Sequence, residues 1–499
     1  MTTVTPHLVI IGGGMTGTAA FIAAVRHRFA KRIDIVDPLP IIGTGTAFSA
    51  SSPVLLCNTS VAITSLLADQ PDDFYAYLHN TGRPVTRDDF VPRSWMTEYA
   101  RDRYLVYRSL HERRGGEHRH LTARAVAVVR DARPRDEGSR YRVELDNGEV
   151  VEATCVFVGH GHGEPRVPEV LQPHLGQEGI FRGLFPEDRL LQALPPRARV
   201  LVLGTRLSGI DAALLLCGSG HHVTMASPSG GLPAVRTRTG RKKPGLVRAS
   251  DIAALETTPD ATGAAFDEKV KTLVRSVIAR ISPRPLEEQI SSLPGVVDRL
   301  RAEIRLAEQG RTDWQDALCA FVDAANDALP RRPSSVRDAA MRLCQGPVAR
   351  YLAAFPLANA KRLLRYIESG RLVIRSGVPL DIRRHRHWLV TWQDASQTPF
   401  DAIVTAAGYH IPKLHAQRDR IDLVNDPSKC CTPPTVHAEL DITLPGASTR
   451  ENIWLLGISS SIRIPSINAI YPMAQQVHRV CRESRATTWS FSTTDAIKG

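Results

Sequence analysis

The start of the chain alternates between short apolar runs and a glycine-rich turn. An apolar run at residues 7–11 leads directly into Gly12, and a second run at residues 33–36 ends on Asp37. Between them, small and apolar residues at positions 18–25 have the composition of a buried helix. Short apolar runs bounded by glycine are typical of buried parallel strands. The pattern therefore predicts a strand–helix–strand unit.

The turn after the first strand has the spacing Gly-x-Gly-x-x-Gly. The first glycine permits the tight turn, the second admits a pyrophosphate to the backbone, and the third lets helix and strand pack closely. Free amides at the helix start then face negative charge. Asp37 follows Gly17 by 20 residues, the separation expected for the acid that binds a ribose hydroxyl. We therefore predict dinucleotide contacts from Gly12, Gly13, Gly14, Met15, Thr16, Gly17 and Asp37.

A second apolar run, residues 199–203, enters another glycine turn and then an apolar helix at residues 212–216. Arg206 stands where the first turn has its pyrophosphate-admitting glycine. Either its guanidinium pairs with phosphate, which we favour, or this unit binds its nucleotide loosely or not at all. The candidate contacts of this unit are Gly204, Arg206, Ser208 and Gly209.

The strand that follows, residues 222–226, does not end on an acidic residue. Serines and basic residues come next, and an arginine accepts the 2′-phosphate that an acid would repel. The sequence therefore favours NADPH over NADH, with Ser227 and Arg236 as the candidate phosphate contacts. The alternative, a solvated basic loop, accounts for most of the basic residues between 236 and 248.

The remaining patterns indicate the fold class. Residues 121–158 read as a β-meander with a turn at residues 146–148. Within residues 250–370, apolar residues recur at helical spacing in five segments separated by proline and glycine. We predict an α/β protein with two Rossmann-like dinucleotide-binding domains and a mostly helical insertion.

The composition and charge of the chain limit the classes of partner that we expect it to bind. The 499 residues carry a formal net charge of +12, but the arginines are dispersed and no nucleic-acid-binding motif accompanies them. No apolar run approaches the ~20 residues of a membrane span, and the N-terminus has no basic signal region. Eight scattered cysteines form neither a disulfide framework nor a zinc spacing, which suits a reducing cytoplasm. We predict a cytoplasmic protein with no nucleic-acid, membrane or metal partner, and a homo-oligomer stays open.

Several segments together resemble one family. Gly-x-Gly-x-Ala-Phe at residues 43–48, Leu-Leu-x-Asn at 55–58 and Ala-Ala-Gly-Tyr at 406–409 are similar to segments of two-dinucleotide FAD/NAD(P)-binding flavoproteins. These are relatives of the N-hydroxylating and Baeyer–Villiger flavin monooxygenases, and nitrosuccinate-forming amino-acid N-monooxygenases are among them. The resemblance makes Gly45, Asn58, Gly408 and Gly457 candidate cofactor neighbours, although Asn58 reads equally as a loop residue that caps its own backbone.

The resemblance also implies the cofactors and a division of the chain. FAD is expected at the first glycine turn and NADPH at the second. The FAD domain is expected at 1–165 and 410–499, the NADPH domain at 166–249 and 371–409, and the insertion that covers the active site at 250–370. Reductases of this kind usually carry an aspartate directly after the glycine that ends the last FAD-domain strand, whereas Ile458 stands there in this chain.

In such enzymes NADPH reduces the flavin, which reacts with O₂ to give a C4a-hydroperoxide that oxygenates an amine. Water destroys this intermediate, so a covering insertion favours oxygenation over reduction alone. The chain has no Cys-x-x-Cys or Cys-x₄-Cys pair for a disulfide reductase. We predict an NADPH-consuming FAD monooxygenase that N-hydroxylates a small amine or amino acid. An NADPH-dependent FAD oxidoreductase without oxygenation and a non-catalytic flavoprotein stay as alternatives.

Residues that contact the substrate are harder to assign. The segment after the last FAD-domain strand is expected beside the flavin ring, with Arg463, Ser466 and Asn468 as candidate substrate contacts. His160 and His162 follow an apolar strand but have no third metal ligand nearby. We interpret them as loop residues, one of which is a candidate neighbour of the flavin.

Overall fold

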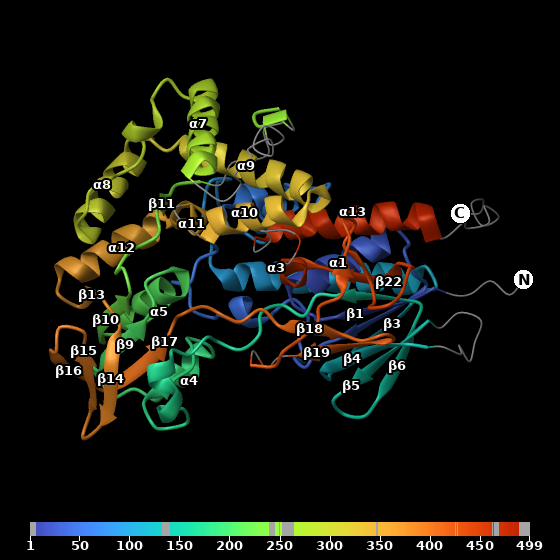
Figure 1. Cartoon of the computed structure of the whole chain (residues 1–499), viewed down its shortest axis with the longest axis horizontal. Coiled ribbons are helices and arrows are strands. Elements are labelled where there is room, and N and C mark those ends of the chain that lie inside the picture. The colour runs from blue at the N-terminus through green and yellow to red at the C-terminus, as the bar shows by residue number, and fades with distance from the viewer. Residues whose placement is uncertain are drawn as a thin grey trace, which may run out of the picture.

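The computed structural model of this chain describes residues 6–131, 140–238, 245–248, 250–251, 264–345, 348–424, 426, 428–461, 463 and 469–488. Two sheets lie side by side, one mixed with a parallel centre and one wholly parallel, with a group of helices along one side of both (Figure 1). In each sheet, a central strand leads directly into one of the two glycine turns. The α/β class with two Rossmann-like units is confirmed.

The first sheet has seven strands in the order β20-β21-β22-β7-β1-β2-β3. Their bounds are β1 (His7–Ile11), β2 (Arg32–Val36), β3 (Glu117–Leu121), β7 (Cys155–Val158), β20 (Thr435–Val436), β21 (Asp441–Thr443) and β22 (Glu451–Leu455). Strand β1 pairs in parallel with both β2 and β7, and β7 pairs in parallel with β22. The carboxyl ends of β1, β7 and β22 therefore meet at one edge of the sheet.

Strand β1 is buried on both faces because successive side chains point to opposite sides. Leu8 and Ile10 pack among helices α1 (Met15–Arg26), α3 (Arg93–Arg113) and α13 (Ile470–Thr488). Val9 and Ile11 pack against an antiparallel sheet of order β18-β19-β4-β5-β6. Its strands are β4 (Ala125–Arg130), β5 (Tyr141–Leu145), β6 (Val150–Ala153), β18 (Lys413–Ala416) and β19 (Arg420–Val424). The predicted meander is confirmed, with Gly148 at φ +84° in its turn.

The second sheet has five parallel strands in the order β13-β10-β9-β17-β8. Their bounds are β8 (Ile180–Phe181), β9 (Arg199–Leu203), β10 (His222–Ser227), β13 (Leu372–Ser376) and β17 (Ala402–Thr405). Helices α5 (Leu207–Gly218) and α12 (Leu357–Glu368) share one core with Val200 and Val202 of β9. On the opposite face, Leu201 and Leu203 share a core with a small antiparallel sheet of β14 (Pro379–Arg384), β15 (Trp388–Trp392) and β16 (Gln397–Phe400).

The predicted helical insertion is built from five helices that precede α12 in the described part of the chain. They are α7 (Ala264–Ile281), α8 (Val296–Glu308), α9 (Trp314–Ala328), α10 (Ser334–Gln345) and α11 (Ala349–Leu352). Val277, Ile278 and Trp314 form part of a core of their own. In Figure 1, α9 and α10 run beside α13 of the first unit while α8 and α12 lie over the second. The insertion therefore spans both nucleotide units.

Short elements complete the described chain. They are α2 (Asp73–Asn80), α4 (Glu187–Gln192), β11 (Val235–Arg236), β12 (Phe355–Pro356) and the 3₁₀ helices η1 (Thr46–Phe48), η2 (Val61–Ile63), η3 (Glu169–His174), η4 (Leu286–Glu288), η5 (Leu329–Arg331) and η6 (Gly457–Ser460). Among the helices that the structure describes, none is both long and apolar enough to cross a bilayer.

Candidate functional site

In the first glycine turn, between β1 and α1, backbone atoms of neighbouring segments pack directly against the glycines. Gly12 has a φ of +100°, and a Cβ there would lie 2.3 Å from the carbonyl oxygen of Gly159. A Cβ on Gly17 would lie 1.8 Å from the carbonyl oxygen of Gly12. Neither position has room for a side chain, and Gly12 also requires a conformation that L residues avoid. These two glycines therefore serve the packing of β1, β7 and α1.

Gly14 has a different role, because its backbone places no such demand. Its φ of −71° and ψ of −162° are open to any residue, and a Cβ there would lie 3.6 Å from the Cα of Gly45. Helix α1 starts at this point without a side-chain cap and without an acidic residue in its first turn, where Met15 and Thr16 lie. Bare backbone on two facing segments and an uncapped helix start fit the pyrophosphate of a dinucleotide.

Asp37 lies beside this turn, immediately after β2. Its Oδ2 accepts a hydrogen bond of 2.6 Å from the amide of Gly13, and its Oδ1 accepts one of 2.8 Å from the amide of Leu39. The side chain is partly exposed, so the carboxylate keeps capacity to accept from a ribose hydroxyl. The structure therefore brings together the glycines and the acid that the spacing predicted.

The end of β22 reaches the same turn. Gly457 has a φ of +58°, and a Cβ there would lie 2.4 Å from Oγ1 of Thr16. The Gly457 amide donates to Oε1 of Gln476 at 2.7 Å, and the Gln476 amide donates to the hydroxyl of Ser460 at 2.7 Å. Gln476 lies on α13, and its role could not be predicted from the sequence, because it depends on contacts with residues that are distant along the chain.

Asn58 and Arg236 lie together, which the sequence did not predict. The Arg236 guanidinium donates to the carbonyl oxygen of Asn58 at 3.0 Å and to those of Tyr351 and Leu352 at 3.4 and 3.5 Å. Burial lowers the pKa of Arg236. Its hydrogen bonds hold the Asn58 loop against the insertion, so a contact between Arg236 and the NADPH phosphate stays a prediction.

The second glycine turn repeats the construction of the first. Gly204 has a φ of +139°, and a Cβ there would lie 2.2 Å from the carbonyl oxygen of Ala406. A Cβ on Gly209 would lie 2.2 Å from the carbonyl oxygen of Gly204. Arg206, at the start of α5 with φ −90° and ψ −164°, matches the backbone of Gly14, and its side chain is exposed. An arginine at this position therefore costs the fold no strain.

Ser227 ends β10 beside this second turn. Its hydroxyl lies 2.8 Å from the hydroxyl of Thr205 and accepts a hydrogen bond of 3.1 Å from the amide of Gly230. Thr205 also donates to the carbonyl oxygen of Gly231 at 2.7 Å. Ser208 lies in the first turn of α5. The predicted residues Gly204, Arg206, Ser208, Gly209 and Ser227 thus gather at one strand edge.

Two crossing segments join the nucleotide units. The amide of Arg166 donates to the carbonyl oxygen of Gly408, which has a φ of +88°, at 2.9 Å. The amide of Gly163 donates to the carbonyl oxygen of His410, also at 2.9 Å. Gly408 therefore belongs to the joint, with open space where its Cβ would stand.

A buried ion pair also links the two units. Nη2 of Arg93, on α3, lies 2.6 Å from Oδ2 of Asp211, on α5, and both side chains are at most 9% exposed. Arg93 further donates to the carbonyl oxygens of Leu56 and Ala47, both of which follow Gly45 in the chain. Burial raises the pKa of Asp211, and the adjacent guanidinium opposes that rise. This contact could not be predicted from the sequence, because the two residues are 118 positions apart.

The predicted substrate contacts are only partly described. Ser466 and Asn468 lie outside the described residues. The amide of Arg463 donates to the carbonyl oxygen of Ser460 at 2.8 Å, which places Arg463 just beyond η6. Burial lowers the pKa of Arg463, and Arg337 of the insertion adds to that effect. Arg463 therefore lies between the end of β22 and the insertion, but its role stays a prediction.

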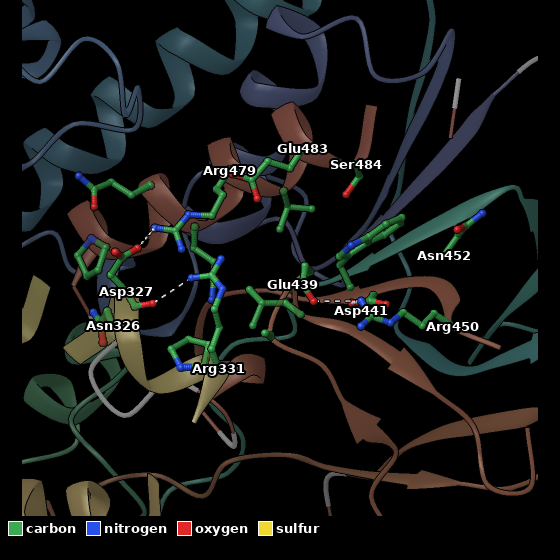
Figure 2. A pocket seen from close by; sticks show the side chains of 18 of the residues that line it. Asn326, Asp327, Arg331, Glu439, Asp441, Arg450, Asn452, Arg479, Glu483 and Ser484 are labelled. Atoms are coloured by element: carbon green, nitrogen blue, oxygen red, sulfur yellow. Dashed lines mark hydrogen bonds and ion pairs between the residues drawn. The ribbon is translucent and has the colours of Figure 1, made fainter. Parts of the chain in front are cut away.

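A cavity of about 370 Å³ lies elsewhere, between α9, β21, β22 and α13. Figure 2 shows its charged wall, where Arg479 pairs with Asp327 at 2.9 Å and Arg450 pairs with Glu439 at 3.0 Å. The cavity meets the start of β22, whereas the glycine turn meets its end. Gln476 is the described residue that touches both. The candidate cofactor cradle and this cavity are therefore different places.

Comparison with known proteins agrees with this architecture. Residues 9–163 match a family described as FAD-NAD(P)-binding. The ornithine N-hydroxylase KtzI of Kutzneria sp. 744 is 15% identical, with a TM-score of 0.59 over 97% of this chain and 100% of that chain. The L-lysine 6-monooxygenase of Pseudomonas syringae is 16% identical, with a TM-score of 0.55 over 97% and 100%. The cadaverine monooxygenase DfoA of Erwinia amylovora is 14% identical, with a TM-score of 0.57 over 100% of both chains. No curated protein matches the sequence itself.

Proposed function

We propose that this chain, which has the fold of two-dinucleotide flavin monooxygenases, is an FAD-dependent enzyme that consumes NADPH and inserts oxygen into a small amine or amino acid. One observation carries the proposal. Two glycine turns of the same backbone construction, Gly12–Gly17 and Gly204–Gly209, stand at the carboxyl ends of β1 and β9, each of which is parallel to both of its neighbours. Carboxyl ends of parallel strands are where such sheets bind dinucleotides.

The first turn is the proposed FAD site. Gly14 and Gly45 would leave room for the pyrophosphate, the start of α1 would donate amide hydrogen bonds to it, and Asp37 would accept from the ribose. FAD, when bound, would supply the redox chemistry that no side chain can perform. The match of residues 9–163 to an FAD-NAD(P)-binding family supports this assignment.

The second turn is the proposed NADPH site. The exposed side chain of Arg206, at the start of α5, has no hydrogen-bond partner among the described residues, so its guanidinium is available to a phosphate. Ser227 ends β10 where an NADH-binding protein would carry an acid. The absent acid favours the nucleotide with the extra phosphate, whereas the available cation would bind the pyrophosphate that NADH and NADPH share.

Oxygenation is favoured over reduction alone by what covers the site. Helices α9 and α10 lie beside α13, and Tyr471 of α13 donates a hydrogen bond of 2.5 Å to Asp323 of α9. Such a cover would exclude water from the reacting flavin. Similar folds belong to proteins named as ornithine, lysine and cadaverine hydroxylases, which supports an aliphatic amine or amino acid as the substrate.

The described cysteines are free, which supports a location in the reducing cytoplasm.

The test is a substrate panel. Purified protein loaded with FAD is mixed with NADPH and with ornithine, lysine, cadaverine or aspartate, and NADPH oxidation, hydrogen peroxide and product mass are measured. We expect one compound to gain one oxygen atom in step with NADPH oxidation, and NADH in place of NADPH to react more slowly. Peroxide alone with every compound would indicate an oxidoreductase without oxygenation. No oxidation of NADPH would indicate a non-catalytic flavoprotein.

A further inference from the structure

The cavity between the insertion and the first sheet, shown in Figure 2, is large enough for a small organic molecule. Its volume of about 370 Å³ lies within the roughly 300–1,000 Å³ that is typical of small-molecule sites. Residues of α9 and η5 line it from the insertion, and residues of β21, β22 and α13 line it from the first nucleotide unit. A ligand in this cavity would therefore touch both parts of the chain.

The cavity is acidic although the chain as a whole is basic. Six carboxylic acids and three arginines line it, whereas the formal net charge of the chain is +12. Two of the six are neutralised by arginines outside the lining, since Glu451 pairs with Arg130 at 2.8 Å and Glu483 pairs with Arg482 at 3.0 Å. Four carboxylates then remain against three guanidinium groups, so the described lining favours a ligand that carries positive charge.

Asp441 is a buried carboxylate of this lining whose nearest cation is shared. Its side chain is 9% exposed, and Nη1 of Arg450 lies 3.5 Å from its Oδ1. The same nitrogen lies closer to Glu439, at 3.0 Å, and the Arg450 side chain is 55% exposed to screening by solvent. Burial raises the pKa of Asp441, and Arg450 opposes that rise. A further cation beside Asp441 would therefore stabilise its ionised form.

An aromatic side chain stands next to this carboxylate. Asp441 of β21 and Trp454 of β22 are directly opposite each other in the antiparallel pair, and both line the cavity. Residues in this relation share one face of the sheet, with Cβ atoms about 4.5–5.5 Å apart. A carboxylate beside an indole suits an organic ammonium ion, because the ring attracts the cation and covers its alkyl chain. Among the described residues, no group of three or more potential ligands could hold a metal ion instead.

Gln476 connects the cavity to the first glycine turn. It lines the cavity from α13, and its side chain bonds to both the Gly457 amide and the Ser460 hydroxyl at 2.7 Å. The Ser460 hydroxyl donates in turn to the carbonyl oxygen of Gly457 at 2.7 Å. Gly457 packs against Thr16 in the first turn of α1. A ligand packed beside Gln476 would therefore restrict the side chain that positions Gly457.

We propose that this cavity is a second ligand site, which takes an aliphatic amine beside Asp441 and Trp454, and that Gln476 couples its occupancy to the first glycine turn. The cavity meets the start of β22, whereas the cofactor turn meets its end, so the amine bound here is an effector and not the molecule that is oxygenated. The amine site itself does not rest on the proposed function. The coupling rests on the proposed FAD site.

The first experiment measures amine binding to the full-length protein by calorimetry in the absence of NADPH. Cadaverine is the probe, and pentane-1,5-diol and glutarate are its neutral and anionic counterparts of the same chain length. Asp441→Asn removes the carboxylate charge of the cavity. Asp188→Asn is the matched control, because Asp188 is exposed on α4 and lies outside the lining. Asp327→Asn, whose side chain is 63% exposed, is the second cavity variant if Asp441→Asn does not fold.

We expect cadaverine to bind the wild type, and the diol and glutarate to bind at least about tenfold more weakly, the value of one charge-assisted contact. Asp441→Asn should weaken cadaverine binding by about tenfold for the same reason. Asp327→Asn should weaken it in the same direction, and Asp188→Asn should match the wild type. No cadaverine binding, equal binding of the diol, or wild-type affinity in both cavity variants would overturn the amine site.

The second experiment tests the coupling. The dissociation constant of FAD is measured by fluorescence titration with and without saturating cadaverine. We expect the two values to differ by about fivefold in the wild type, with FAD changing the affinity for cadaverine by the same factor. Gln476→Met, which keeps the bulk of the side chain but neither hydrogen bond, should bring the ratio close to one. A ratio of one in the wild type, or an unchanged ratio in Gln476→Met, would overturn the coupling. If the wild type binds no FAD at all, the proposed function fails, while the calorimetry still decides on the amine site.

Discussion

Replacing single glycines of the first turn by alanine should separate the role of the fold from the role of the ligand. In Gly14→Ala the new methyl group is added to an extended backbone and lies 3.6 Å from the Cα of Gly45 and 3.9 Å from the carbonyl oxygen of Thr44, which are ordinary van der Waals contacts. In Gly12→Ala the methyl group would lie 2.3 Å from a backbone oxygen, at a φ of +100°. The two substitutions add the same atoms two residues apart, so each serves as the control for the other.

For Gly14→Ala we expect the free energy of unfolding of the apoprotein to change by less than about 1 kcal/mol. Alanine restricts the unfolded chain, which stabilises by about 0.4–1 kcal/mol, and it is a poorer N-cap than glycine, which costs a similar amount. The methyl group would, however, fill the space between Gly14 and Gly45. Loss of one or two amide hydrogen bonds to a charged phosphate costs about 3 kcal/mol, or roughly 100-fold in FAD affinity.

For Gly12→Ala the expected order is reversed. A non-glycine residue in this conformation costs about 1–3 kcal/mol, and the overlap with Gly159 adds about 1–3 kcal/mol. The apoprotein itself should therefore lose about 2–6 kcal/mol of stability. Urea unfolding of the apoproteins and titration with FAD measure the two effects separately. Wild-type FAD affinity in Gly14→Ala, or wild-type apoprotein stability in Gly12→Ala, would refute the assignment of these roles.

Three further predictions concern the rest of the site. Arg206→Ala should raise the KM for NADPH by about tenfold, the value of one exposed charge-assisted contact, and leave FAD affinity unchanged. The KM for NADH should rise by a similar factor, because both nucleotides carry the pyrophosphate, and an unchanged KM for both would refute the contact. Asp211→Ala should cost about 3–5 kcal/mol in urea unfolding because it leaves the buried Arg93 unpaired, whereas Arg93→Met with Asp211→Leu should recover most of that loss. Burial lowers the pKa of His118 to about 4, below its unfolded value of about 6.5, so its share of stability is present above pH 6.5 and lost as the pH falls towards 4. The thermal midpoint should therefore fall between pH 7 and 4.5, and less steeply in His118→Gln.

The elements that the sequence predicted share one property, which is that their signal is local. Each of these patterns can be recognised within a short stretch of sequence. Examples are the glycine spacing of residues 12–17, the alternation in residues 125–145 and the helical periodicity after residue 264. Burial then follows from pattern, because a strand or helix must turn its apolar positions towards a core. Val9 and Ile10 of β1, which face opposite cores, illustrate this.

The contacts that the sequence did not predict are pairings between distant segments. The sequence makes Arg236 a candidate phosphate contact, but its side chain is buried and donates to carbonyl oxygens 115 or more positions away. Gln476 reads as an ordinary polar residue of an amphipathic helix until Gly457 is placed beside it. Such roles depend on the relative placement of whole elements, and no periodicity within a window of 20 residues encodes them.

In the two turns, the outer and middle positions of the spacing Gly-x-Gly-x-x-Gly have different physical roles. Its outer glycines, at 12 and 17 and again at 204 and 209, are required by backbone oxygens of the protein itself. Its middle position has the same extended backbone in both turns but carries glycine in one and arginine in the other. The fold therefore does not require glycine at the middle position, and we expect contact with the ligand to decide which residue stands there. Arg206 leaves the second fold intact, and whether that turn holds a nucleotide depends on the guanidinium meeting the phosphate that Gly14 would meet with its backbone.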